Sequence, residues 1–244
     1  MSTLRFAPRF QGPPRSANGG YAAGALVEAG FGVDAGTYTV RLSRPPRLDT
    51  DLTVAETDEG WALSDGDELV AAARLDERML EPVTAVDRRT AGRAEAAYDG
   101  LLSHPFGACF GCGPGSDQGL RIFPGEVPEA VPGRRRVAAT VNAVPELPRD
   151  ATNDQQISLA TAWSALDCAS GWAAHIEQQP IVLGQMTASV ITLPRIDEHY
   201  LIVAEERGRQ GRRVETACTL YTDDGAVMGT AEHTWIAIDP AEFT

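Results

Sequence analysis

An internal repeat constrains the fold of this chain more than any other feature of its sequence. Residues 46–49 read PRLD and precede VAE at 54–56, whereas residues 194–197 read PRID and precede VAE at 203–205. The two copies agree in order, and their spacing differs by one residue. A repeat of this kind indicates that one supersecondary unit has been duplicated, and it sets the architecture before any single element is considered.

A turn and a helical segment accompany each copy of the repeat. The pairs Asp65-Gly66 and Asp224-Gly225 follow the two copies, and Asp-Gly is typical of tight turns between antiparallel strands. Upstream of the copies, the small residues at 19–29 and 158–176 predict helices. Each half therefore has the same order, a helix followed by several strands joined by short turns.

The second half carries the stronger strand signals. Runs rich in β-branched and apolar residues predict strands there, at 136–142, 182–193, 200–206, 214–221 and 227–238. In the first half the segments are shorter, and 68–75 is the clearest strand. The intervening stretch, about 76–150, is rich in Gly and Pro, so we expect an ordered loop region that leads into the strand at 136–142.

The segment 158–176 is apolar on almost every side. Trp163, Leu166 and Trp172 are spread around its helical circumference, so a helix here is expected to be buried on most faces. In a chain made otherwise of strands, such a helix favours a sheet wrapped around it. At 244 residues the chain has room for one large domain or two small ones.

Composition excludes several classes of function. The formal net charge is −13, and all 21 basic residues are arginine, so mechanisms that need a lysine amine are excluded. An acidic chain is a poor nucleic-acid binder, because that binding depends on a basic surface. We expect no membrane partner, because no apolar run reaches the ~20 residues of a membrane helix. Residues 1–15 do not resemble a secretory signal, which favours a cytoplasmic protein with reduced cysteines.

These features together resemble the hotdog-fold acyl-CoA thioesterase superfamily, and specifically its double-hotdog, thioesterase II-like members. The residues that carry the resemblance are Asn18-Gly19-Gly20-Tyr21, RPPRLD at 44–49, Trp163 to Asp167, and Gly211-Arg212-Arg213. The resemblance implies an α+β double hotdog, in which two antiparallel sheets, each wrapped around a central helix, join into one continuous sheet. The expected divisions are an N-terminal hotdog repeat at 1–100, a connecting loop region at 101–135 and a C-terminal hotdog repeat at 136–244.

The resemblance also implies an activity, hydrolysis of an acyl-CoA or a related acyl thioester without a cofactor. The alternative is a non-catalytic module that binds acyl thioesters or lipids. Acyl chain length stays open, and so does further assembly into a homo-oligomer.

Thioester hydrolysis needs donors for the carbonyl oxygen and an activated water or nucleophile. Asn18, Gly19 and Gly20 open the first helix, where free amides and a partial positive charge are found. Two glycines also let a substrate oxygen approach the backbone. The alternative is that these three residues form only a turn and a helix cap, with Asn18 as the capping residue.

Asp167 is the candidate acid. It lies between Leu166 and Cys168 in the helix that is expected to be buried, and an unpaired carboxylate there would cost several kcal/mol or become neutral. Such a group serves either in proton transfer or nucleophilic attack, or as part of a structural ion pair or cap. The sequence does not separate the general base from the nucleophile.

The repeat predicts that one site is shared by both halves. GALV at 24–27 parallels SALD at 164–167, so Val27 matches Asp167, whereas the glycine opening has no counterpart at 158–160. If the two helices lie antiparallel, the amides near Gly20 and the carboxylate of Asp167 flank a single thioester.

Substrate-binding positions are expected on the second half. Double-hotdog thioesterases often place polar partners on these strands, and Gln185 and Thr187 match such positions, as does one of Glu232 and His233. Arg209 and Arg212 surround a turn and are candidate ligands for coenzyme A phosphates. The alternatives are that these arginines form an ordinary solvated surface, or that the basic trio at 134–136 binds the phosphates instead.

A Cys-x-x-Cys pair has the spacing of half a zinc site. Cys109 and Cys112 follow His104, but no second such pair exists, and Cys168 and Cys218 belong to a helix and a strand. A closed tetrahedral site needs four ligands. We therefore expect a loop without metal, with zinc as the alternative.

Overall fold

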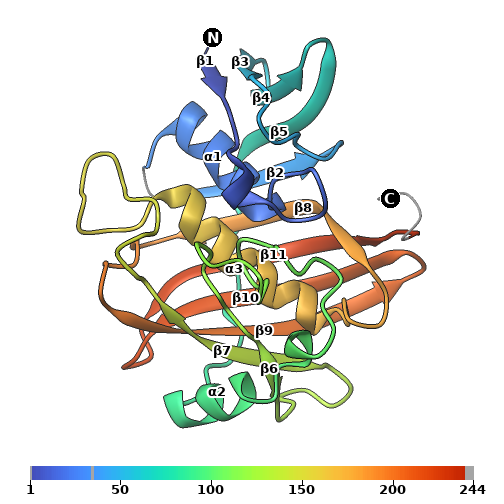
Figure 1. The fold of residues 1–244 in the computed structure, drawn as a ribbon, viewed down its shortest axis with the longest axis vertical. Helices are drawn as coiled ribbons and strands as arrows, with labels where there is room; N and C mark the ends of the chain where they lie inside the picture. The colour runs from blue at the N-terminus through green and yellow to red at the C-terminus, as the bar shows by residue number, and fades with distance from the viewer. Residues whose placement is uncertain (1, 34–35, 240–244) are drawn as a thin grey trace.

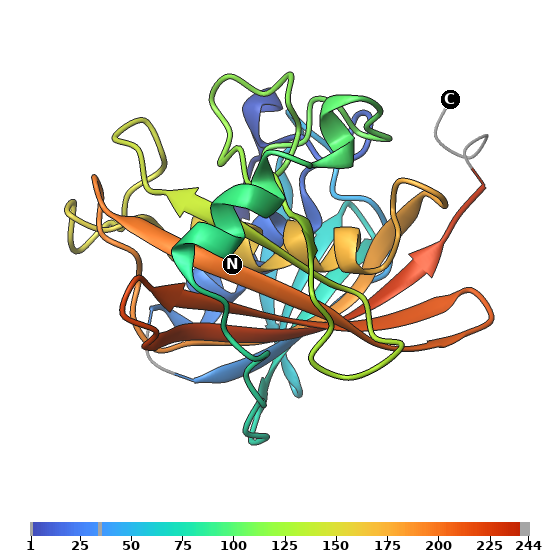
Figure 2. The ribbon, with the colours of Figure 1, turned by 90° about the horizontal axis from the view of Figure 1, so that it is seen from below.

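A computed structural model describes residues 2–33 and 36–239, and one sheet runs through the whole of it (Figure 1). The sheet has 11 strands in the order β1-β3-β4-β5-β2-β8-β11-β10-β9-β7-β6. Every pairing between these strands is antiparallel. Helices α1 and α3 lie against one face, and the strands curve beneath them (Figure 2). The predicted double hotdog is confirmed.

Each half contributes one helix and one block of strands. The first half has β1 (Ser2–Leu4), η1 (Pro8–Phe10), α1 (Gly19–Phe31), β2 (Thr37–Leu42), β3 (Leu52–Thr57), β4 (Gly60–Asp65) and β5 (Glu68–Asp76). The connection has α2 (Arg88–Glu95), η2 (Asp99–Leu101) and β6 (Gly125–Val127). The second half has β7 (Arg136–Asn142), α3 (Leu159–Ala173), β8 (Ile181–Val190), β9 (His199–Gln210), β10 (Arg213–Thr222) and β11 (Val227–Ala237).

All the predicted elements are present, with shifted ends. Helix α3 ends at Ala173, before the predicted 176, because His175 adopts a left-handed conformation with φ 62°. Helix α1 continues to Phe31, where Gly32 at φ 82° terminates it. Strand β9 runs four residues past its predicted end, to Gln210. Helix α2 lies in the stretch that was expected to be loop.

The two halves share local geometry as well as order. Asn18 caps α1 and Ser158 caps α3, each by accepting a hydrogen bond from the backbone N–H three residues ahead. Asp49 and Asp197, which end the PRLD and PRID motifs, both have left-handed φ angles, of 52° and 64°. The duplication inferred from the sequence therefore extends to single backbone positions.

Helices α1 and α3 are antiparallel neighbours at the centre of the core. Near the start of α1, Gly20 lies against Asp167, whereas Gly24 lies against Trp163 and Ala160 near the start of α3. All 15 residues of α3 are buried, as its apolar circumference predicts. The antiparallel arrangement required for a composite site is therefore present.

The segment that connects the two repeats crosses from the first half to the sheet of the second half, where it packs on the face opposite to α3. Val83, Ala91 and Ala94 form a small apolar cluster with Leu201 and Val203 on β9, whereas the alternate β9 residues belong to the main core. The first-half sheet ends at Asp76. The segment 77–100, which the sequence analysis grouped with the first repeat, thus lies partly against strands of the second.

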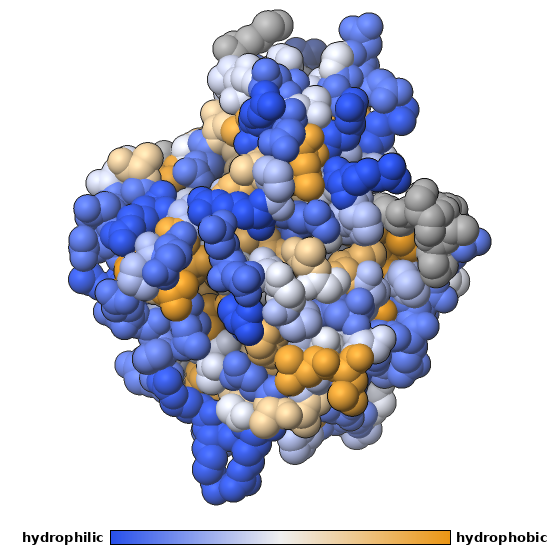
Figure 3. Space-filling model, in the orientation of Figure 1, coloured by the Kyte–Doolittle hydropathy of each residue, from blue (hydrophilic) through white to orange (hydrophobic). Residues whose placement is uncertain are grey.

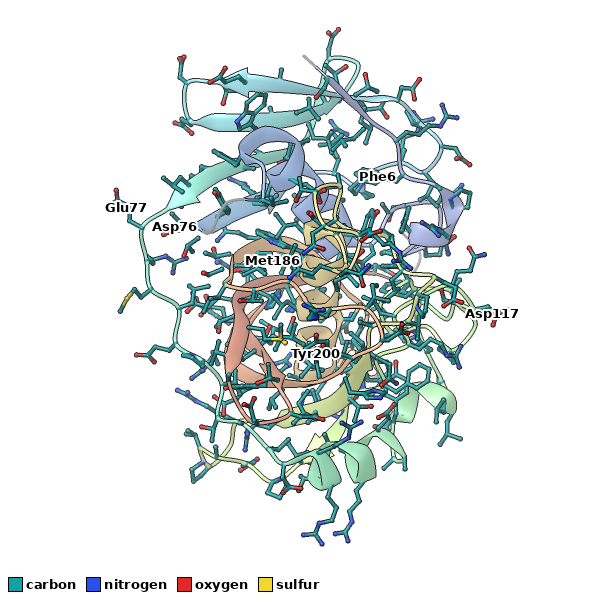
Figure 4. The ribbon with its side chains drawn as sticks, turned by 90° about the vertical axis from the view of Figure 1, so that its left-hand side faces the viewer. Phe6, Asp76, Glu77, Asp117, Met186 and Tyr200 are labelled. Atoms are coloured by element: carbon teal, nitrogen blue, oxygen red, sulfur yellow. The ribbon has the colours of Figure 1, made fainter. Side chains whose placement is uncertain are left out.

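A polar network covers the seam between the half-sheets, where β2 pairs with β8. The hydroxyls of Thr39 and Thr187 lie 2.7 Å apart, and Thr39 also donates to Asp76 at 2.7 Å. Arg78 donates to Asp76, Thr187 and Glu232. Figure 4 shows Asp76 where β5 ends. Burial raises the pKa of Asp76, but the Thr39 hydroxyl and the Arg78 guanidinium outweigh it and lower the pKa to about 2.

We expect this network to make stability depend on acid pH. A depressed carboxyl pKa stabilises the fold above the ordinary value near 4, and the contribution is lost as pH falls through about 2. Asp76→Asn should lower the free energy of unfolding at pH 7 by roughly 1 kcal/mol, since Arg78 is half exposed and partly screened. The variant should also show a flatter stability profile between pH 5 and 2 in urea titrations. Parallel profiles for the two proteins would contradict this role.

Candidate functional site

A cavity of about 280 Å³ opens beside the start of α1 and the middle of α3. Its lining is mainly apolar, and it includes Leu42, Phe106, Ile181, Leu183 and Trp235. The face of the molecule seen in Figure 3 is largely hydrophilic around its rim, with patches of hydrophobic side chains between the hydrophilic ones. Concave apolar sites with a few convergent polar groups are the usual form of small-ligand sites. Among the polar residues lining this cavity are Asn18 and Asp167.

Asp167 is buried, with 2% of its surface exposed. Its Oδ2 accepts the Gly20 N–H at 3.0 Å and the Asn18 side-chain N–H at 3.1 Å. Its Oδ1 has no hydrogen-bond partner among the described residues. Burial raises the pKa of Asp167 to about 7, although the Gly20 and Asn18 donors oppose the rise. A carboxyl with one oxygen fixed and one uncommitted can accept a proton at the uncommitted oxygen.

The amides at the start of α1 divide into two kinds. The Gly20 N–H is occupied by Asp167, and the Tyr21 N–H donates to the Asn18 side chain. The Gly19 N–H, the first of the helix, has no acceptor among the described residues, and Gly19 lines the cavity. Gly20 therefore positions the acid, which corrects the expectation that its amide would polarise a carbonyl. Of the two glycines, Gly19 belongs to the cavity lining and Gly20 does not.

Asn18 links several groups of the site. Its side-chain oxygen accepts from Tyr21 N and from Ser164 Oγ, and its side-chain nitrogen donates to Asp167. The same nitrogen lies 3.5 Å from the Cys168 sulfur and 3.7 Å from the Cys109 sulfur. Asn18 is thus a cap, as the sequence indicated, and it also holds the carboxyl of the other repeat.

A second contact mirrors the one between Gly20 and Asp167. At the start of α3, the Ala160 N–H donates to the carboxylate of Glu28 near the end of α1, at 3.2 Å. Each helix start therefore meets an acid from the opposite helix. The two contacts differ in their surroundings, because Asp167 lines the cavity and Glu28 does not.

Three cysteine sulfurs gather next to this acid. The Sγ atoms of Cys109, Cys112 and Cys168 all lie within 4.8 Å of one another, and all three residues are buried. Hydrogen bonds from the other two thiols lower the pKa of Cys109 well below its usual value and raise those of its partners. The sequence separated Cys168 from the Cys-x-x-Cys loop, but packing of the loop on α3 brings it there.

The two polar residues predicted on β8 do not reach the cavity. Thr187 belongs to the network at the seam between the half-sheets, and neither Gln185 nor Thr187 lines the cavity. Of the neighbouring candidates on β11, Glu232 pairs with Arg78. His233 faces the core, where burial lowers its pKa to about 3, so its imidazole is neutral. Side chains alternate along a strand, and the sequence did not fix the register.

The predicted arginines also lie outside the cavity lining. Arg209 donates to Glu206 and to the Ala174 carbonyl, and Arg212 donates to the Ala237 carbonyl. The arginine that lines the cavity in the described part of the chain is Arg44, which is half exposed and pairs with Glu68 at 3.0 Å. It belongs to the RPPRLD motif, but nothing in that motif indicated that Arg44 would face a cavity.

Gly20 should tolerate no side chain. A Cβ at this position would lie 2.4 Å from the Asp167 Cβ and 2.8 Å from the Trp163 carbonyl oxygen. We expect Gly20→Ala to destabilise the fold by about 1–3 kcal/mol, because backbone and acid must separate. Gly92→Ala is the matched control: it lies in α2, an added Cβ there has no neighbour within 4 Å, and it should raise stability by up to about 1 kcal/mol. Thermal and urea unfolding measure the stability of both variants. An equal change in stability for Gly20→Ala and Gly92→Ala would contradict this packing.

Comparison with solved structures identifies the architecture. The tesB protein of Mycobacterium avium subspecies paratuberculosis superposes with a TM-score of 0.61 at 12% identity, over 97% of this chain and 92% of that one. The acyl-CoA thioesterase II TesB2 of Mycobacterium marinum gives 0.54 at 15% identity, over 92% and 90%. A hot dog fold protein of unknown function from Alicyclobacillus acidocaldarius gives 0.54 at 11%, over 98% and 92%.

Sequence comparisons find no matching family model and no matching curated protein. None of the helices in residues 2–33 and 36–239 has the length and apolar character needed to span a membrane. The resemblance inferred from the sequence is confirmed at the level of the fold. Over nearly its whole length, this chain is a double-hotdog protein.

Proposed function

We propose that this protein hydrolyses an acyl thioester, such as an acyl-CoA, in the cavity shared by its two repeats. The observation that carries the proposal is the buried Asp167 carboxyl, which lines an apolar cavity, has one oxygen uncommitted, and lies at the start of the helix from the other repeat. Solved structures of the same fold that are named thioesterases support the reaction class.

Each part of the cavity has a role in the proposed reaction. The acyl chain lies against the apolar lining, and the thioester carbonyl oxygen accepts the Gly19 N–H. Asp167 takes a proton from a water molecule, whose oxygen attacks the carbonyl carbon. The charge that develops on the carbonyl oxygen is stabilised by Gly19 and by the helix dipole. The tetrahedral intermediate then breaks its C–S bond. The thiol leaves with the proton that Asp167 took from water, and the acyl group is released as the free carboxylic acid.

The mirrored contact of Glu28 with Ala160 favours a second candidate, a module that binds acyl thioesters without turnover. Glu28 accepts a backbone N–H at the start of α3 without lining the cavity. Asp167 can equally serve only to accept the Gly20 N–H at the start of α1, with no part in catalysis. The two functions differ in what happens after binding, so turnover separates them.

Replacing Asp167 tests the hydrolytic role directly. Asp167→Asn keeps an acceptor for the Gly20 N–H but removes the base, so kcat for thiol release from an acyl-CoA panel should fall by roughly 10²–10⁴-fold. Binding of the acyl-CoA, measured by calorimetry, should be retained. Glu28→Gln is the matched control, since it alters the equivalent acid outside the cavity and should leave kcat unchanged. Tight binding by the wild-type protein with no thiol release would instead establish the binding module.

Arg44 provides a separate test for coenzyme A as the carrier of the acyl group. Its guanidinium can pair with a phosphate at the cavity, so Arg44→Ala should raise KM for an acyl-CoA roughly five- to tenfold and leave kcat unchanged. The same acyl group on N-acetylcysteamine, which lacks phosphates, should show no change. Arg47→Ala, at an exposed arginine paired with Asp65, serves as control. An equal rise in KM for both substrates would contradict a phosphate contact.

A further inference from the structure

We propose that Cys109, Cys112 and Cys168 bind one zinc ion at the edge of the cavity. Their sulfur atoms lie within 4.8 Å of one another, although two come from the connection and one from the buried helix α3. All four cysteines of the chain are free thiols in the structure. Soft thiolate ligands in a compact group are typical of zinc sites.

One of the sulfur–sulfur separations is close to the edge of a zinc tetrahedron. With Zn–S bonds near 2.3 Å, two thiolates of one tetrahedral ion lie about 3.8 Å apart. The Cys109 and Cys168 sulfurs are 3.6 Å apart, a separation that a single ion bridges with little movement. Bonded sulfurs of a disulfide would lie about 2.05 Å apart. Cys109 and Cys168 are therefore two free thiols that one ion can bridge, and the Cys112 sulfur lies within 4.8 Å of both.

The loop that carries the Cys-x-x-Cys pair is held firmly in place. Phe110, between the two cysteines, donates its N–H to Gln11 and accepts one from Leu120, both at 2.7 Å. Gly111 packs directly on Cys168, and a Cβ at this position would lie 2.1 Å from the Cys168 sulfur. A glycine is therefore required for the loop to bring its two thiols to the third. The loop is thus packed directly against the part of α3 that carries the third thiol.

Nitrogen donors surround the sulfurs. His104 accepts the Phe106 N–H at its Nδ1, which places the proton of the neutral ring on Nε2, 3.3 Å from the Cys112 sulfur. Asn18 directs its side-chain N–H toward Cys109 and Cys168. Such N–H donors stabilise thiolate charge, in the way that groups around a metal site support its ligands. His104 thus acts as a donor to a ligand, and the chain supplies three ligands to the ion.

The fourth position of the ion faces the cavity. Cys109, Cys112 and Cys168 all line it, whereas His104 does not. Zinc sites with three protein ligands keep their fourth position for water or an incoming ligand. If the proposed thioesterase function holds, the class of ligand that fits here is the thiol released from the substrate.

Metal content of the purified protein tests the site without any substrate, so its outcome is independent of the proposed hydrolysis. Elemental mass spectrometry of the full-length protein, prepared under reducing conditions, should give close to one zinc per chain. Cys109→Ser and Cys168→Ser should reduce zinc to trace levels. Cys218→Ser is the matched control, because Cys218 is also buried but lies outside the cluster, and it should retain full zinc.

Cobalt replaces zinc as a spectroscopic probe. Co²⁺ added to the metal-free protein should give thiolate-to-cobalt charge-transfer bands and the strong visible bands of a tetrahedral centre, and Cys168→Ser should weaken both. His104→Ala should retain one zinc per chain. Loss of zinc in this variant would show that His104 is a ligand and would contradict the open fourth position. Absence of zinc and of the cobalt spectrum in the reduced protein would overturn the site, as would equal zinc loss in Cys218→Ser.

Discussion

The candidate site depends on the close antiparallel contact between α1 and α3. Gly20 and Gly24 allow it, because a Cβ at either position would approach atoms of α3 to within 3 Å. At this distance the start of one helix meets an acid from the middle of the other, and the Gly20 amide fixes one oxygen of Asp167. The contact therefore brings Asp167 of one repeat to the helix start of the other, beside the cavity.

Duplication supplied two equivalent positions at this interface, and the sequence has made them different. The helix caps Asn18 and Ser158 are 140 residues apart, as are Val27 and Asp167. At this matched position the first repeat has Val27, which is buried in the core. The second repeat has Asp167, whose carboxyl lines the cavity. The symmetric fold thereby has one acid in the cavity lining, Asp167, whereas the acid at the other helix start, Glu28, lies outside that lining.

Local patterns predicted the repeat, the buried helix and the strands, and the resemblance to double-hotdog proteins implied how the sheets join, but neither predicted the surroundings of the cavity. The circumference of α3 and the β-branched runs of the second half gave the buried helix and its strands, because burial imposes a periodicity that can be read along the chain. Helix α2 was missed since it is short and rich in arginine and lies among loop residues. The register of β8 places Thr187 away from the cavity. Packing of the loop at 109–112 on α3 brings Cys109 to Cys168, although 59 positions separate them in the chain. Neither follows from neighbouring residues.

The seam between the half-sheets has a consequence for synthesis of the chain. Thr39 on β2 meets Thr187 on β8, and 148 positions separate them. A pairing between such distant segments forms only after most of the chain is available, and closing so long a loop delays it. During translation the first half therefore presents β2 as an open strand edge until its partner emerges, and unpaired edges promote aggregation. Protection of that edge by a chaperone or by rapid elongation would favour correct assembly.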